Sequence, residues 1–245
     1  DDGIYSPGIQ ALADAMVKIG KVTIIAPDNE QSGKSHSLTL NDPIRLKHVN
    51  LKKGLKGWAV NGTPVDCAKV AIKKLFDKKP DLVFSGINLG ANLGRNLIYS
   101  GTVSAAYEGS ILGVSSAAIS LDSFKGNNFV AAKYVATKIA NHLLKHKLPK
   151  GTMLNVNVPD IAKKDLKGFL VTKQGSQSFV DTYEKRIDPR GNSYFWIRGE
   201  MINDDSSIEY DGEAVSSGYV SVTPIQFRIT NELYINELKK KILYE

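Results

Sequence analysis

Cysteine is nearly absent from this chain of 245 residues, which contains only Cys67. A single cysteine excludes a disulfide framework and a cysteine-rich metal site, and it is typical of proteins of the reducing cytosol. The sequence also lacks an apolar run of about 18 residues, the length that a membrane-spanning helix needs. We therefore expect a cytoplasmic protein without a membrane span.

Histidine is scarce too, and the four histidines do not have zinc-binding spacing. His142 and His146 are four residues apart, but they lie near the end of a lysine-flanked predicted helix, where we expect surface positions. We assign no role to His36. The glycine-rich motifs G-x-G-x-x-G and G-x-x-x-x-G-K-S/T are both missing, which argues against NAD binding and against ATP-driven transfer.

Acidic residues are outnumbered, and the formal net charge is +7. The lysines come in pairs, such as Lys52-Lys53 and Lys78-Lys79, and no dense basic run alternates with aromatic residues. A nucleic-acid interface needs a basic stripe of that kind. We therefore predict a solvated basic surface and no nucleic-acid partner.

Four apolar segments are present that read as buried strands, namely 21–27, 81–88, 114–121 and 151–159. Helical segments lie between them, and the first two have clear starts. Ser6 followed by Pro7 caps a helix over 6–20, and Thr63 with Asp66 forms a capping box for another. The predicted apolar stripe of the first helix comprises Ile9, Leu12, Ala13, Met16 and Val17. This alternation predicts an α/β protein with a Rossmann-like, mostly parallel sheet flanked by helices over 1–170.

The character of the sequence changes after about residue 170. The segment 174–200 carries aromatic residues on both sides of "DPRGN", a hairpin turn signal, and we expect an extended β-hairpin arm there. Residues 201–245 are expected to add a strand and a terminal helix to what we predict is a single domain over 1–245. The apolar side chains of 178–198 need a cover, which is either the arm's own domain or a partner subunit.

The chain starts with "DDG" directly before a helix, which is the position of a loop that follows a strand. We therefore expect a short apolar strand ahead of Asp1 that the given sequence does not contain. In an open parallel sheet, the loops that follow the strands meet at one edge. Here those loops carry Asp1, Asp2, Ser32, Ser35, Asn88, Asn92, Ser100, Thr102 and Ser104. Hard oxygen ligands of this kind select Mg²⁺, Mn²⁺ or Ca²⁺ over zinc.

Ser100-Gly101-Thr102 stands where another helix begins. The free backbone N–H groups and hydroxyls of a helix start bind anions. A phosphate beside a hard divalent cation is the ligand that this combination predicts.

Six motifs occur in one order along the chain: "DDGIYSPG", "APDNEQSGKSHSLTL", "VNGTPVDC", "SGINLGANLG", "IYSGTVSAAYEG" and "GYVSVTPI". Together they closely resemble SurE, the survival protein E family of metal-dependent 5'/3'-nucleotidases, over nearly the whole chain. The resemblance implies hydrolysis of nucleoside monophosphates with one divalent ion per subunit, Mg²⁺ or Mn²⁺. It also implies a homodimer or homotetramer, partly through the 178–198 hairpin, and a short strand before "DDG".

The resemblance assigns roles to residues through the matching motifs. It implies Asp1, Asp2, Ser32 and Asn88 as metal ligands. It implies Asn92, Ser100, Gly101 and Thr102 as phosphate-side or substrate-binding residues. One of the catalytic residues Asp1 and Asp2 would orient or deprotonate the attacking water, and the sequence leaves open which one.

Two other functional classes are alternatives to a metal-dependent nucleotidase. A phosphatase of the haloacid dehalogenase type needs the pattern D-x-D, whereas here Asp2 is adjacent to Asp1 and Gly3 follows, so the pattern fails. A nucleotide-binding, stress-regulatory module without turnover remains the alternative, and a phosphatase assay separates the two.

Overall fold

The computed structural model describes residues 1–126 and 128–244. Its six helices within these residues are α1 (Pro7–Met16), α2 (Pro64–Val70), α3 (Gly101–Ile111), α4 (Val130–Lys145), α5 (Asp211–Ser216) and α6 (Glu232–Tyr244). The strands are β1 (Ile24–Pro27), β2 (Leu46–Asn50), β3 (Lys56–Val60), β4 (Leu82–Leu89), β5 (Ser115–Asp122), β6 (Met153–Pro159), β7 (Phe169–Val171), β8 (Ser178–Ile187), β9 (Ser193–Ile202) and β10 (Val220–Ile225). In this part of the chain, no helix has the length and apolar composition to cross a membrane.

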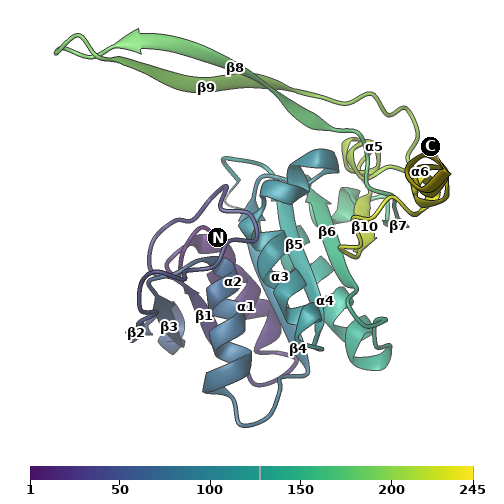
Figure 1. The fold of residues 1–245 in the computed structure, drawn as a ribbon. Helices are drawn as coiled ribbons and strands as arrows, with labels where there is room; N and C mark the ends of the chain where they lie inside the picture. The colour runs from purple at the N-terminus through teal and green to yellow at the C-terminus, as the bar shows by residue number, and fades with distance from the viewer. Residues whose placement is uncertain (127, 245) are drawn as a thin grey trace.

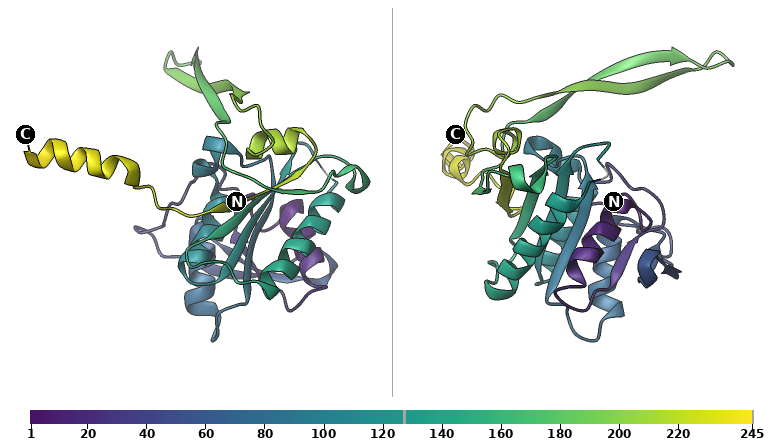
Figure 2. Two further views of the ribbon diagram at one scale, coloured as in Figure 1. Left: turned by 90° about the vertical axis from the view of Figure 1, so that its right-hand side faces the viewer. Right: turned by 180° about the vertical axis from the view of Figure 1, so that it is seen from behind.

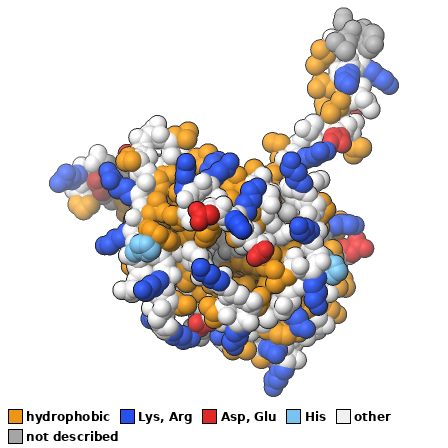
Figure 3. Space-filling view, turned by 90° about the horizontal axis from the view of Figure 1, so that it is seen from below, with side chains coloured by type: hydrophobic (Ala, Val, Ile, Leu, Met, Phe, Trp, Pro, Cys, Tyr) orange, Lys and Arg blue, Asp and Glu red, His pale blue; other side chains and the backbone are white. Residues whose placement is uncertain are grey.

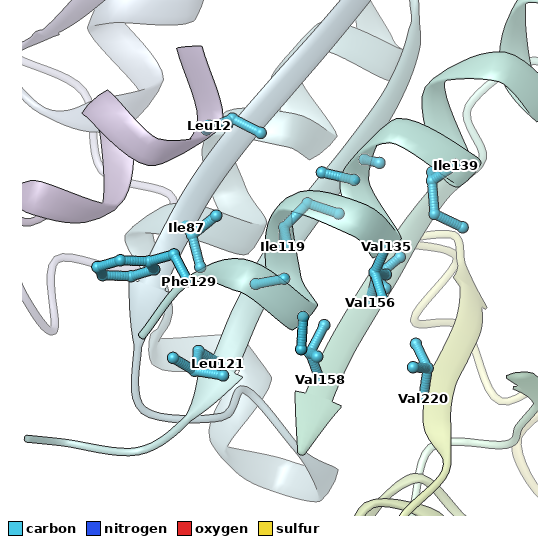
Figure 4. Close-up of a cluster of buried hydrophobic side chains, with 14 of the residues drawn as sticks. Leu12, Ile87, Ile119, Leu121, Phe129, Val135, Ile139, Val156, Val158 and Val220 are labelled. Carbon is cyan, nitrogen blue, oxygen red and sulfur yellow. The ribbon is translucent and has the colours of Figure 1, made fainter. Parts of the chain in front are cut away.

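The main sheet has five strands in the order β4-β5-β6-β10-β7. β4, β5 and β6 run parallel, β10 is antiparallel to β6, and β7 is parallel to β10. Figure 1 shows the helices that flank this sheet. α1 and α4 cover one face, where a core cluster includes Leu12, Ile119, Val135 and Val156 (Figure 4). α3 covers the other face, so the predicted α/β class with a mostly parallel, helix-flanked sheet is confirmed.

A second ladder of three strands, β1-β3-β2, stands apart from the main sheet. β1 pairs in parallel with β3, and β2 pairs antiparallel with β3. A cavity of about 530 Å³ separates β1 from β4 and is lined by both strands and by α1 and α2. On the underside of the molecule, hydrophobic side chains border a hollow (Figure 3). β1 and β4 therefore belong to different sheets, and the cavity lies between them.

The hairpin arm projects from the body as the antiparallel pair β8-β9, and α6 also points away from it (Figure 2). The turn of the hairpin arm lies at the predicted "DPRGN". Asp188 donates its backbone N–H to the carbonyl of Asn192 at 2.9 Å, and the Gly191 N–H reaches the carbonyl of Asp188 at 3.0 Å. Gly191 has φ 86°, a left-handed conformation that glycine adopts without steric cost. The strands extend to residue 202, slightly beyond the expected arm.

Three local expectations need correction. The first helix ends at Met16 rather than at residue 20, and Val17, expected in its apolar stripe, is 47% exposed. The strands β2 and β3 were not anticipated, and β2, at the edge of its ladder, has no buried residue and no apolar centre. β7 was also missed, since three residues are too few to give a periodic signal.

Candidate functional site

The Asp1 carboxylate lies against the first turn of α3. The Thr102 hydroxyl donates to Asp1 Oδ1 at 2.9 Å. A Cβ on Gly101 would stand 3.0 Å from Asp1 Cβ and 2.9 Å from Pro64 Cγ, so a side chain at Gly101 would collide with both. The backbone N–H of Gln31 donates to the Asp1 carbonyl at 2.9 Å, which joins the loop after β1 to the chain start. Three segments far apart in the sequence thus meet at Asp1.

Asp2 and Asn88 line the cavity between β1 and β4, as do Asp1 and Thr102. The backbone N–H of Leu89, at the end of β4, interacts with the Asp2 carboxylate. The Asn88 amide nitrogen donates to the Gly90 carbonyl at 2.7 Å. This bond orients the amide so that Oδ1 is the atom that Asn88 offers to a cation.

Burial also perturbs the Asp2 carboxyl and raises its pKa. A carboxylate with a raised pKa gains from a bound cation, because opposite charge favours its ionised form.

Ser32 lies on the exposed loop 28–42, and its hydroxyl donates to Glu30 Oε1 at 2.8 Å. Its neighbour Gln31 holds the Asp1 carbonyl, so Ser32 is one residue away from a contact with the acidic pair. The loop is also fastened further along, where the Ser35 N–H donates to the Tyr99 carbonyl at 3.1 Å. The structure therefore brings the Ser32 segment to the two aspartates.

The start of α3 offers donors for an anion beside these oxygens. Ser100 is the N-cap, and its side chain accepts a hydrogen bond from the Val103 N–H at 3.1 Å. The N–H groups of Gly101 and Thr102 occupy the first two helical positions, which have no acceptor inside the helix. The helix dipole adds partial positive charge at this end. Ser104, the other hydroxyl expected here, is buried in the first turn.

Asn92 is placed differently from the other predicted site residues. It is buried, and its amide nitrogen donates to the Ser120 hydroxyl at 2.7 Å. Its backbone N–H donates to Asn157 Oδ1 at 2.8 Å, and its carbonyl accepts from Asn155 at 2.8 Å. These bonds tie the loop after β4 to β5 and β6, and the predicted phosphate contact of Asn92 stays a prediction.

Sequence reasoning missed Glu108, a buried carboxylate of α3. Its oxygens contact His36 Nε2 at 3.0 Å and Lys69 Nζ at 3.3 Å. His36 belongs to the Ser32 loop and Lys69 to α2, so one carboxylate joins three elements of the site. A second buried acid, Asp66, accepts the Thr39 N–H at 3.2 Å and holds the far end of the same loop. The "SAAYEG" pattern, with Glu108 on an otherwise apolar helix, was the available signal.

The donor set fits a hard divalent cation. Asp1, Asp2, Ser32 and Asn88 offer two carboxylates, a hydroxyl and an amide oxygen, which are the ligand types that Mg²⁺ and Mn²⁺ prefer. Within the described residues, no group of three or more His, Cys, Asp or Glu side chains could hold a metal ion.

An α/β fold whose strand ends gather acids, an amide and a hydroxyl beside a helix start defines a phosphate-binding protein of the metal-dependent kind. The chain belongs to the SurE family. Its residues 1–181 match the family model "Survival protein SurE". The resemblance stated from the motifs is thereby confirmed.

Individual relatives extend the match to almost the whole chain. The 5'-nucleotidase SurE of Geotalea daltonii is 46% identical over 98% of this chain and 96% of its own length. That of Carboxydothermus hydrogenoformans is 42% identical over 98% of this chain and 92% of its own. The crystal structure of the SurE protein from Aquifex aeolicus has a TM-score of 0.85 at 39% identity and covers all of this chain and 97% of its own.

Proposed function

We propose that this protein is a metal-dependent 5'-nucleotidase that hydrolyses nucleoside 5'-monophosphates to nucleoside and phosphate. Relatives that are named 5'-nucleotidase SurE cover nearly the whole chain. The single observation that carries the proposal is the contact of Asp1 with Thr102, because it sets a carboxylate directly beside the free N–H groups of α3. A cation and a phosphate would therefore be bound side by side.

Asp1, Asp2, Ser32 and Asn88 would hold the ion, which would supply a Lewis acid and lower the pKa of a bound water. Thr102 fixes the Asp1 carboxylate through its hydroxyl, so Asp1 acts as a ligand in one orientation. One of Asp1 and Asp2 would orient the attacking water or remove its proton.

The start of α3 binds the phosphoryl group. The N–H groups of Gly101 and Thr102 donate to its equatorial oxygens, where negative charge is stabilised as the ester bond breaks. Ser100 can donate its hydroxyl hydrogen, since its oxygen only accepts from Val103. Water adds to phosphorus, the alkoxide of the nucleoside leaves with a proton, and inorganic phosphate remains.

The proposal is tested with Asp2→Asn, measured as phosphate release from 5'-AMP at saturating Mn²⁺. The amide keeps the size of the side chain but removes its charge and its basicity, so we expect the rate to fall by orders of magnitude. Asp77→Asn is the matched control, because Asp77 is exposed and precedes β4 at the opposite end of that strand. A folded Asp2→Asn protein with a near-normal rate would refute the assignment.

Metal removal provides the second test. Chelation by EDTA should abolish phosphate release, and added Mn²⁺ should restore it. Full activity in a verified metal-free sample would reject a metal-dependent reaction. Binding of 5'-AMP without any phosphate release would instead support a nucleotide-binding module.

We also propose a homodimer or homotetramer built through the 178–198 hairpin. The arm exposes large apolar side chains on a two-stranded ribbon, including Tyr183, Phe195, Trp196 and Ile197. A ribbon of this composition gains stability by packing against another surface. A cytoplasmic location is part of the same proposal, since the thiol of Cys67 is free and buried.

A further inference from the structure

A second cavity, of about 600 Å³, opens next to the candidate site. Its polar lining includes Asp28, Gln31, Asp42, Arg45 and Asn61. We propose that this cavity binds the ribose and base of the nucleotide, as a nucleoside subsite beside the metal and phosphate positions. The inference rests on the proposed function and assigns the part of the substrate that the catalytic residues do not touch.

Both walls of the cavity continue into the candidate site. One wall includes Asp28 and Gln31, and the chain reaches Ser32 directly after them, while Gln31 also holds the Asp1 carbonyl. The opposite wall includes Thr63, the N-cap of α2, and the next residue is Pro64, which faces Gly101 at the start of α3. A monoester with its phosphate at that helix start can therefore extend its leaving group into this cavity.

The chemistry of the lining suits a sugar with hydroxyl groups. Asp28 and Asp42 provide exposed carboxylates, which are strong acceptors for ribose hydroxyls, as in other nucleotide sites. The cavity wall is also held in shape. Asn61 Oδ1 accepts the Arg45 N–H at 2.6 Å, and the Asn61 amide nitrogen donates to the Pro43 carbonyl at 3.4 Å.

Arg45 is the residue best suited to meet the base. Among the described residues, its guanidinium group has no carboxylate within salt-bridge distance. Its donors match the ring nitrogens and carbonyl oxygens of a nucleobase. Among the described residues, no aromatic side chain lines the cavity, so the base would meet the Arg45 guanidinium rather than an aromatic ring. Arg45 is therefore the specificity-determining residue.

The test compares two substrates that share a phosphate and differ in the leaving group. 5'-AMP carries a ribose and a base, whereas p-nitrophenyl phosphate carries neither. For Arg45→Ala, we expect the ratio of kcat/KM for 5'-AMP over that for p-nitrophenyl phosphate to fall about tenfold, mainly through KM for 5'-AMP. Asp42→Asn should lower the same ratio. Lys47→Ala is the control, because Lys47 is exposed on β2, two residues after Arg45, and does not line the cavity.

The outcomes separate this inference from the proposed function. A fall in the ratio for Arg45→Ala and Asp42→Asn, with Lys47→Ala at the wild-type value, supports the subsite. An unchanged ratio in both variants overturns it, and so does an equal loss on both substrates. A wild-type protein that hydrolyses neither substrate rejects the proposed function itself, and the subsite with it.

Discussion

Replacing Glu108 by glutamine should loosen the candidate site without leaving a hole in the core. The Glu108 side chain is 5% exposed and contacts His36 at 3.0 Å and Lys69 at 3.3 Å. The loop with His36 also carries Ser32, and α3, which carries Glu108, begins at the proposed phosphate donors. The amide of glutamine has nearly the same volume, so the change removes the charge and keeps the packing.

The cost in stability can be bounded from these contacts. A hydrogen bond to a charged group contributes about 1.5–3 kcal/mol when it is well shielded. Here the partners His36 and Lys69 are 31% and 44% exposed, so water can solvate them once the carboxylate is gone. We therefore expect Glu108→Gln to lower the free energy of unfolding by about 1–2 kcal/mol in total.

The loss of metal affinity in Glu108→Gln should be larger than the small loss of stability would suggest. Residues that hold metal ligands in place typically change metal affinity by about 10–100-fold when they are replaced. Because Glu108 holds the loop of Ser32 rather than the ion, added metal should compensate. We expect a higher half-saturating Mn²⁺ concentration and a nearly normal kcat at saturation.

Urea denaturation and Mn²⁺ titration of phosphate release measure the two effects separately. Glu209→Gln is the control, since Glu209 is exposed and pairs with Lys173 on the surface at 2.9 Å, where an ion pair contributes little. An unchanged half-saturating Mn²⁺ concentration in a destabilised Glu108→Gln protein would refute the positioning role. Unchanged stability would show that the contacts to His36 and Lys69 do not form.

Three further predictions concern other parts of the chain. Burial raises the pKa of the Asp211 carboxyl above its value in the unfolded chain, so folding favours the protonated form. The contribution of Asp211 to stability therefore declines as pH rises through the folded pKa. In urea melts, Asp211→Asn should therefore show a larger deficit relative to wild type at pH 4 than at pH 7, and a deficit that grew with pH would contradict this. Burial raises the pKa of the Cys67 thiol to about 12, so its reaction with Ellman's reagent at pH 8 should be at least about a hundredfold slower in the native than in the urea-unfolded protein, and equal rates would be evidence against it. Trp196→Glu should lower the mass measured by light scattering, and a monomeric wild type would end the oligomer proposal.

Local signals predicted much of the fold and of the site. The helix caps at Ser6 and Thr63 could be predicted from the sequence, because each capping hydrogen bond spans only three residues. The Ile9 backbone N–H donates to the Ser6 hydroxyl oxygen, and the Asp66 backbone N–H donates to that of Thr63. The grouping of the residues that follow the strands could also be predicted, since parallel strands present their carboxyl ends at one edge of the sheet.

Contacts between side chains far apart in the sequence could not be predicted in this way. Glu108 and His36 are 72 positions apart, and only the packing of α3 against the loop 28–42 makes the carboxylate and the imidazole partners. The amide of Asn92 is likewise committed to Ser120 by the way in which β4 and β5 pair. Such contacts decide which polar side chain faces a ligand and which one stabilises the core, and a single sequence does not show them.

The cavity between β1 and β4 connects the sheet to the candidate site. Within the described residues, β1 pairs only with β3 and β4 only with β5, so each leaves one edge with free N–H and C=O groups. The residues of β4 are almost all only half-buried. α1 and α2 also line the cavity, and so do Asp1, Asp2 and Asn88, so the unpaired strand edges lie beside the candidate metal ligands.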